Sequence, residues 1–171
     1  MPSEARLRAL RGNLIGARID AMPLVAWGGA EVRRYRGRLY ALPRALGSMP
    51  NNDILEVAAS ACCVLPPGLG RIVLDRVSGA GLRIESLGER LALEYRAGGE
   101  CLRPAARRPR RALRNLFQEA GVVPWMRPRL PLLYAGGRLV AVADLWLDAE
   151  FTAAAGEAGL QPRWEGRPRL F

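Results

Sequence analysis

Residues 113–134 read LRNLFQEAGVVPWMRPRLPLLY, and this stretch carries most of the information about the fold. Apolar residues recur at helical spacing in its first part, which predicts a helix over residues 111–120 with the stripe Leu113, Leu116, Phe117 and Ala120. Gly121 suits the left-handed position at which helices often end. A turn over residues 122–131, interrupted by prolines, then leads into a strand at 132–134.

Short strands are predicted on both sides of this helix in the sequence. Downstream, apolar runs predict strands at 139–142 and 145–147, the first of them preceded by the turn Gly136-Gly137. Upstream, a buried run at 57–65 and alternating residues predict strands at 71–75, 90–95 and 101–103. The pattern favours a mostly antiparallel sheet domain that carries one helix.

The N-terminal part has a different pattern. A helix over residues 3–21, capped by Ser3, precedes a predicted three-strand meander at 24–27, 31–35 and 38–42. Residues 43–53, PRALGSMPNND, are typical of a linker. We therefore expect an α+β protein: a small helix-plus-β-hairpin module over 1–47, a linker over 48–55, the mostly antiparallel domain over 56–150, and a C-terminal tail or edge strand over 151–171.

Composition removes several classes of function. The 171 residues contain no lysine and no histidine, so all 26 basic residues are arginine, and the net charge is +10. Without histidine there is no Ser-His-Asp or Cys-His pair and no histidine-ligated metal site. Without lysine there is no Schiff base and no phosphate-loop lysine. Asp144 and Asp148 could gather a cation, but no further ligand accompanies them, so neither a metal site nor a catalytic set is predicted.

Cysteine usage and the N-terminus bear on the compartment. Cys62, Cys63 and Cys101 are odd in number and have no C-x-x-C spacing, which indicates a reduced, cytoplasmic protein with small buried thiols. The first residues, MPSEARLRAL, do not form a signal peptide, and no apolar run is long enough to cross a membrane. The sequence leaves a homodimer open.

The arginines are concentrated in one segment. Residues 103–129 hold eight arginines and a single carboxylate, Glu119, a local net charge of +7. Several precede or begin the predicted helix, whose positive end also favours phosphate. This window predicts an RNA-phosphate surface formed by Arg103, Arg107, Arg108, Arg110, Arg111, Arg114, Arg127 and Arg129. Phe117 and Trp125 are expected to anchor it, and the meander tip offers a secondary set, Arg33, Arg34, Arg36 and Arg38, with a solvated hairpin as the alternative.

Residues 100–147 resemble a known family. The run Glu100–Pro104, then LRNLFQEAGVVPWMRPRLPLLY, then Leu139–Trp146 is similar to the C-terminal domain of bacterial tRNA(Ile)-lysidine synthases, which typically reads R-x-x-x-L-K-K-L/I-F/W-Q-E, P-P-W-L-R-x-R-x-P-L-L-Y and A-V-x-G-L-W. Residues 1–42, with Val32-Arg33-Arg34-Tyr35, are similar to the end of that family's substrate-recognition domain. Five positions depart from the family's usual residues: Arg114 and Asn115 replace paired lysines, Val123 a proline and Asp144 a glycine, and Pro128 stands between the two arginines.

The resemblance implies a role in tRNA modification. Family members use ATP to adenylate the wobble cytidine of an isoleucine tRNA with a CAU anticodon, and free lysine then displaces AMP. Their catalytic domain carries a Ser-Gly-Gly-x-Asp-Ser phosphate loop, which is absent from these residues. The resemblance therefore implies a tRNA-binding part that holds the acceptor stem and body, is inactive alone and binds no cofactor itself, with Asn115 added to the surface. It also implies that the mostly antiparallel domain is β-sandwich-like, which agrees with the predicted strands. The alternative is a basic protein-interaction module that docks an acidic partner or the catalytic domain.

Overall fold

The computed structural model of the chain describes residues 23–43, 55–58 and 62–171, together with Glu4, Arg8, Gly12, Leu14, Gly16, Arg18 and Ala21. Most of the expected helix over 3–21 and most of the expected linker over 48–55 therefore lie outside the described residues. The chain divides into two compact units, Met1–Ser48 (unit 1) and Met49–Phe171 (unit 2). Each unit is described by itself.

Unit 1 contains the predicted meander. Strands β1 (Leu24–Trp27), β2 (Ala30–Tyr35) and β3 (Arg38–Pro43) form an antiparallel sheet in the order β1-β2-β3. The turn between β2 and β3 holds two residues, Arg36 and Gly37, both with positive φ, at 47° and 75°. This is the turn geometry that matches the twist of a two-residue hairpin, so the sequence located all three strands to within a residue.

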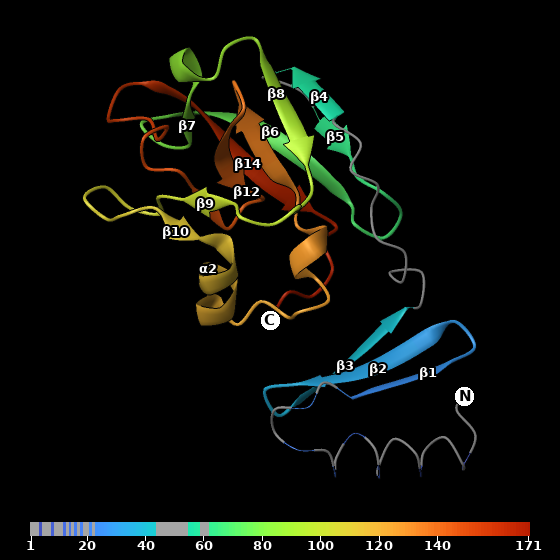
Figure 1. The fold of residues 1–171 in the computed structure, drawn as a ribbon. Coiled ribbons are helices and arrows are strands. Elements are labelled where there is room, and N and C mark those ends of the chain that lie inside the picture. The colour runs from blue at the N-terminus through green and yellow to red at the C-terminus, as the bar shows by residue number, and fades with distance from the viewer. Residues whose placement is uncertain are drawn as a thin grey trace. The chain divides into compact units, whose positions relative to one another are not determined.

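Unit 2 is built mainly from two antiparallel sheets (Figure 1). The five-stranded sheet has the order β13-β12-β11-β8-β4, and the four-stranded sheet has the order β5-β6-β14-β7. The strands of the first are β4 (Leu55–Ala58), β8 (Arg90–Glu94), β11 (Leu132–Ala135), β12 (Arg138–Val142) and β13 (Trp146–Leu147). Those of the second are β5 (Cys62–Val64), β6 (Arg71–Ser78), β7 (Leu82–Arg83) and β14 (Ala158–Glu165). The α+β class with mostly antiparallel strands is confirmed.

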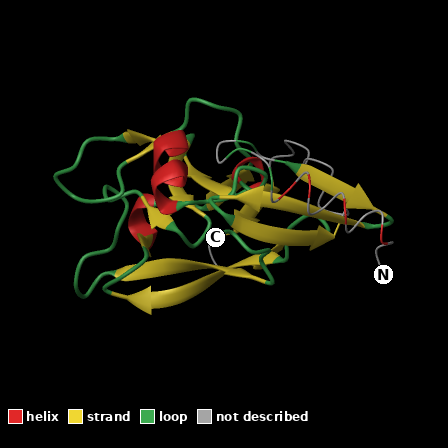
Figure 2. Ribbon diagram, turned by 90° about the horizontal axis from the view of Figure 1, so that it is seen from below, coloured by secondary structure: helices red, strands yellow, loops and turns green. Residues whose placement is uncertain are grey.

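The described part of unit 2 also contains two short 3-10 turns, Ile84–Ser86 and Arg127–Arg129, a small hairpin and the helix α2 (Leu113–Ala120), described below (Figure 2). The centre of the core is at β11 and β12, where Leu132, Leu133, Val140 and Val142 are fully buried. Consecutive buried residues mean that both faces of these strands are covered. Phe117 of α2 stacks at a tilt against Trp146 of β13, with ring centroids 5.8 Å apart, so the helix covers this end of the five-stranded sheet.

Strand β14 corrects one expectation. We expected residues 151–171 to form a tail or an edge strand, but β14 pairs with β6 along eight residues and with β7 on its other side. It therefore lies inside its sheet. Trp164 is buried and donates its indole N–H to the Leu69 carbonyl, which ties β14 to the turn before β6. Gly159 allows this close packing, because a Cβ there would lie 1.9 Å from the Ala80 carbonyl oxygen.

The cysteines correct another expectation. Cys62 and Cys101 are exposed and Cys63 is partly exposed, and all three are free thiols. Cys62 and Cys63 lie on β5, an edge strand, where neighbouring side chains point to opposite faces of the sheet. Burial by the sheet raises the pKa of the Cys63 thiol. Small apolar character alone therefore did not place these residues in the core.

Candidate nucleic-acid interface

The arginine-rich window begins as a β-hairpin. Strands β9 (Cys101–Leu102) and β10 (Arg111–Ala112) pair antiparallel, and residues 103–110 connect them. Leu102 is fully buried and fixes the hairpin to the domain. The predicted helix start at residue 111 is wrong by two residues, because Arg111 and Ala112 pair with Leu102 and Cys101 before the chain turns into α2.

The tip of the connecting loop is a tight turn. The Arg108 N–H donates to the Ala105 carbonyl at 3.2 Å, and Arg107 between them has a left-handed φ of 63°. Glycine or asparagine usually occupies such a position, since a β-carbon crowds the following carbonyl oxygen there and makes the conformation costly. Residues 105–110 are all exposed. An arginine therefore occupies a position that favours glycine, and its side chain points away from the domain.

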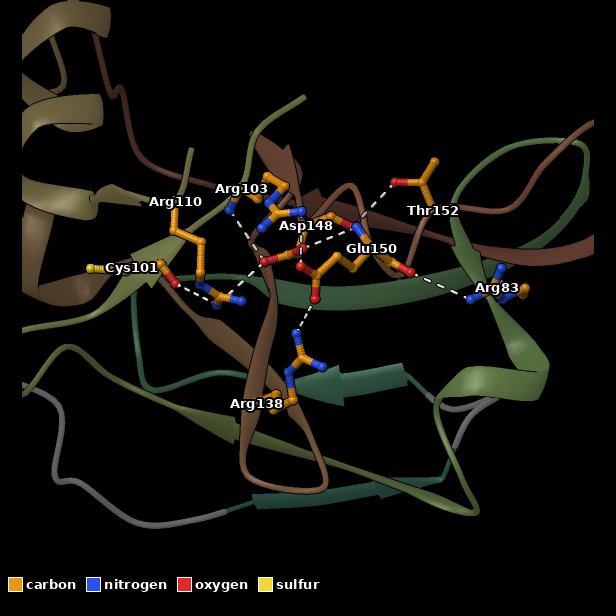
Figure 3. Close-up of polar contacts among 8 residues, drawn as sticks. All are labelled: Arg83, Cys101, Arg103, Arg110, Arg138, Asp148, Glu150 and Thr152. Atoms are coloured by element: carbon orange, nitrogen blue, oxygen red, sulfur yellow. Dashed lines mark hydrogen bonds and ion pairs between the residues drawn. The ribbon is translucent and has the colours of Figure 1, made fainter. Parts of the chain in front are cut away.

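The base of the loop is held by Asp148, a carboxylate with no exposed surface. Its Oδ2 accepts the Arg103 N–H at 3.2 Å and lies 3.4 Å from the Arg110 guanidinium, while its Oδ1 accepts the Glu150 N–H at 3.0 Å (Figure 3). The Ala149 N–H also donates to the Arg103 carbonyl at 2.8 Å. Asp148 thus ties both strands of the loop base to the segment after β13.

Arg103 and Arg110 take part in this scaffold. Arg103 pairs with Glu150 at 3.0 Å, and Glu150 also binds Arg138. The Arg110 guanidinium donates to the Cys101 carbonyl at 3.0 Å (Figure 3). The hydrogen bond from Arg138, reinforced by the charge of Arg103, holds the pKa of Glu150 below its ordinary value. These two arginines therefore position the loop through contacts with Glu150, Asp148 and the Cys101 carbonyl.

Helix α2 follows the hairpin directly. Its first residue, Leu113, donates its N–H to the Glu100 carbonyl at 2.9 Å, and Leu113, Leu116 and Phe117 are buried. Arg114 and Asn115 lie on the exposed side of the first turn. No acidic side chain and no side-chain cap neutralises this end of the helix. Its partial positive charge therefore adds to that of Arg114 and attracts an anion.

Glu119 pairs with Arg111 through both carboxylate oxygens. Arg111 reaches it because β10 places this arginine beside the last turn of α2. The hydrogen bonds from Arg111 hold the pKa of the Glu119 carboxyl below its ordinary value. Since Glu119 is the single carboxylate of the window, this pairing leaves Arg114 unneutralised.

Arg127 and Arg129 brace the turn after α2. The Arg127 Nε donates to the Val122 carbonyl at 2.9 Å, and Arg129, only 8% exposed, donates to the Trp125 carbonyl. Trp125 and Phe117 are buried beneath this turn and α2. The two arginines therefore stabilise the turn backbone, and Arg129 offers little surface to a ligand.

Arg107, Arg108, Arg114 and Asn115 remain. Their side chains are exposed and make no hydrogen bond or ion pair within the part of the chain that the structure describes. Arg107 and Arg108 lie at the hairpin tip, and Arg114 and Asn115 lie in the first turn of α2, which begins three residues after the loop ends. We call these four residues the open arginine surface.

The secondary set in unit 1 is largely engaged. Arg33 pairs with Glu31 at 2.8 Å, Arg34 donates to the Leu14 carbonyl at 3.0 Å, and the Arg36 guanidinium lies 5.4 Å from the Tyr35 ring centroid. Arg38 is exposed. Arg33 and Arg34 are therefore engaged within unit 1, and the RNA contact expected of this set stays a prediction.

Among the described residues, no three acidic, cysteine or histidine side chains lie close enough to hold a metal ion. Asp144 pairs with Arg167 at 2.8 Å, and Asp148 is bound as above. No helix in the described ranges is long and apolar enough to span a membrane.

Comparison with known proteins assigns the family. The family described as "TilS substrate C-terminal domain" matches residues 91–164, and "TilS substrate binding domain" matches residues 1–40. The first match covers the β9–β10 hairpin, α2 and β14. The chain belongs to the tRNA(Ile)-lysidine synthase family.

Individual tRNA(Ile)-lysidine synthases agree with this assignment. The chain is 30% identical over 159 residues to that of Coxiella burnetii, covering 93% of this chain and 35% of the relative. It is 35% identical over 152 residues to that of Photobacterium profundum, covering 88% and 34%. For Ralstonia nicotianae the identity is 36% over 180 residues, covering 95% and 36%. The chain thus spans about a third of the length of the curated relatives it matches.

Sequence reasoning missed the residues that shape the site. Asp148 lies 45 residues from Arg103, and no local pattern connects them. One signal was available, namely the excess of arginine over acidic residues in the sequence. If Asp148 is buried near the last strands, it is expected to pair with one of these arginines.

Changing Arg107 to glycine tests the turn. Glycine adopts φ 63° without the steric cost that arginine bears, so Arg107→Gly is expected to raise the free energy of unfolding by about 1 kcal/mol. Arg108→Gly removes the same charge at an ordinary φ and is expected to lower it slightly. Urea denaturation of both variants measures the difference, and an equal loss in the two would refute the account of this turn.

Glu100, whose carbonyl accepts the Leu113 N–H at the start of α2, makes the stability of unit 2 depend on pH. Burial would raise the pKa of its carboxyl, but N–H bonds from Gly98 at 2.6 Å and Ala97 at 2.7 Å, with Arg96, outweigh this and hold it below the ordinary value. A lowered folded-state pKa stabilises the fold above the unfolded-state pKa, and this stability is lost as pH falls through the folded-state pKa.

We therefore expect acidification below about pH 4.5 to destabilise the wild type more than Glu100→Gln. At neutral pH that variant should lose about 1–2 kcal/mol, because a neutral amide accepts the same bonds more weakly. Denaturation curves at both pH values measure this. If both proteins lose the same stability on acidification, the Glu100 carboxyl is not a source of the acid destabilisation.

Proposed function

We propose that this chain binds the tRNA substrate for lysidine synthesis and holds its acceptor stem and body. The open arginine surface supplies the main phosphate contacts. ATP-dependent transfer of lysine to the wobble cytidine of an isoleucine tRNA with a CAU anticodon belongs, in this proposal, to a catalytic domain outside these 171 residues. ATP and lysine are accordingly cofactor and co-substrate of that domain.

One observation carries the proposal. Within the arginine window, Arg103, Arg110, Arg111, Arg127 and Arg129 are bound to carboxylates or carbonyls, whereas Arg107, Arg108 and Arg114 are exposed without an intramolecular acceptor among the described residues. Five arginines thus fix the hairpin and the turn after α2. The three beside them are exposed and form a cationic surface on this fixed backbone. Such a surface suits the phosphates and 2′-hydroxyls of an RNA helix, which are read by shape.

The test is an equilibrium titration of the chain with isoleucine tRNA bearing a CAU anticodon, at two salt concentrations. A methionine tRNA and a plain RNA duplex serve as competitors. Preference for the isoleucine tRNA that persists at the higher salt supports tRNA recognition. Equal, salt-sensitive binding to all three reduces the chain to a nonspecific basic clamp. No binding refutes the proposal and favours the protein-interaction module.

A further inference from the structure

The segment Arg167–Phe171 is fixed beside the turn that follows α2. Leu170 is 2% exposed, and its carbonyl accepts the Val123 N–H at 2.9 Å. Figures 1 and 2, seen from directions 90° apart, both place this end of the chain next to α2. Arg167 is held further by its ion pair with Asp144. The segment is therefore fixed to the domain beside α2, the helix whose first turn carries Arg114.

Exposure alternates along this segment. Arg169 and Phe171 are exposed on either side of the buried Leu170, so both side chains project away from the domain. Phe171 is 42% exposed, which is uncommon for a large aromatic ring in this structure. The Arg169 guanidinium makes no hydrogen bond or ion pair within the described residues. A ring and a free guanidinium thus lie two residues apart on an anchored backbone.

The same residues line an open depression of about 420 Å³. An exposed aromatic ring beside a cation is the arrangement that binds single-stranded nucleic acid, because the base stacks on the ring and its phosphate meets the charge. Bases inside a duplex are already stacked on one another and cannot use such a ring. The open arginine surface suits a helix, whereas this feature suits an unpaired nucleotide.

We propose that Arg167–Phe171 forms a subsite for an unpaired nucleotide at the end of a bound RNA helix: the base stacks on Phe171 and Arg169 binds the adjoining phosphate. The subsite rests on the proposed function, since the helix is held by the open arginine surface. It adds a contact to single-stranded RNA that neither the arginine window nor the family assignment supplies.

The test compares a blunt RNA duplex with the same duplex carrying a short unpaired extension at its 3′ or 5′ end. The wild type is expected to bind one extended duplex roughly 5- to 50-fold more tightly than the blunt one, from stacking of a single base. Phe171→Ala should reduce this ratio to about 1, and Phe171→Trp should keep it. Arg169→Ala should reduce the ratio and the salt dependence of extension binding.

Two matched control residues lie on strands β5 and β6 of the four-stranded sheet. Val64→Ala removes an apolar side chain that is 75% exposed on β5, and Arg76→Ala removes an exposed arginine on β6. Both should leave the ratio unchanged. A ratio near 1 in the wild type, or an unchanged ratio in Phe171→Ala, overturns the subsite while binding of the blunt duplex leaves the proposed function standing. Absence of RNA binding by the wild type overturns both.

Discussion

A chain in which Arg107, Arg108 and Arg114 are all changed to alanine is expected to bind isoleucine tRNA about 100-fold more weakly than the wild type. Each charge-assisted contact to phosphate contributes about 1 kcal/mol or more, and 1.4 kcal/mol corresponds to a tenfold change in affinity. Three lost phosphate contacts should also reduce the slope of log affinity against log salt by roughly 3. Titrations at several salt concentrations measure both quantities.

The control variant removes three positive charges from the four-stranded sheet instead. Arg71, Arg76 and Arg163 lie on β6 and β14, where Arg71 and Arg163 pair with Glu165 and Asp75. Changing all three to alanine lowers the net charge equally, but should leave the salt slope close to that of the wild type. If the two triple variants lose the same affinity, binding follows net charge alone and the open arginine surface has no special role.

The second large effect is expected at Asp148. Asp148→Ala leaves the Arg103 N–H, the Glu150 N–H and the Arg110 guanidinium without their acceptor, at a buried position. We expect the free energy of unfolding to fall by about 3 kcal/mol. Because the loop base is released, RNA affinity should fall as well, although Asp148 is an acidic residue whose removal makes the chain more basic.

The direction of the expected change in RNA affinity makes Asp148→Ala informative. A purely electrostatic account predicts tighter RNA binding when a carboxylate is removed, whereas the scaffold account predicts weaker binding. Glu150→Ala is the matched control, since Glu150 is a partly exposed carboxylate of the same network and should cost no more than about 1 kcal/mol. Urea denaturation and amide exchange at residue 103 report the loss. Tighter RNA binding by a folded Asp148→Ala protein would contradict the scaffold account.

The sequence predicted the local elements well. The stripe Leu113, Leu116 and Phe117 and the glycine at 121 mark α2 because helix periodicity and termination are encoded within a few residues. Alternating residues located β6 and β8 for the same reason. The family resemblance also came from a continuous ordered motif, and the comparisons confirm it.

Long-range relations were not predictable in this way. The place of β14 inside its sheet depends on pairing with β6 more than 80 positions earlier, and the burial of Arg129 depends on the fold of the whole turn. From the sequence alone, all eight arginines of residues 103–129 were expected to have the same role, phosphate binding. Separating them required knowing which carboxylates and carbonyls the fold brings within reach, and most of those acceptors are backbone groups or come from residues 148–150.

The most direct measurement of the central claim uses the unmodified chain. Arginine side chains are labelled with phenylglyoxal in the presence and absence of saturating isoleucine tRNA, and the labelled positions are quantified by mass spectrometry. We expect tRNA to protect Arg107, Arg108 and Arg114 strongly and to leave Arg76, an equally exposed arginine on β6, as reactive as before. Undiminished labelling of Arg107, Arg108 and Arg114 in the tRNA complex would contradict the account.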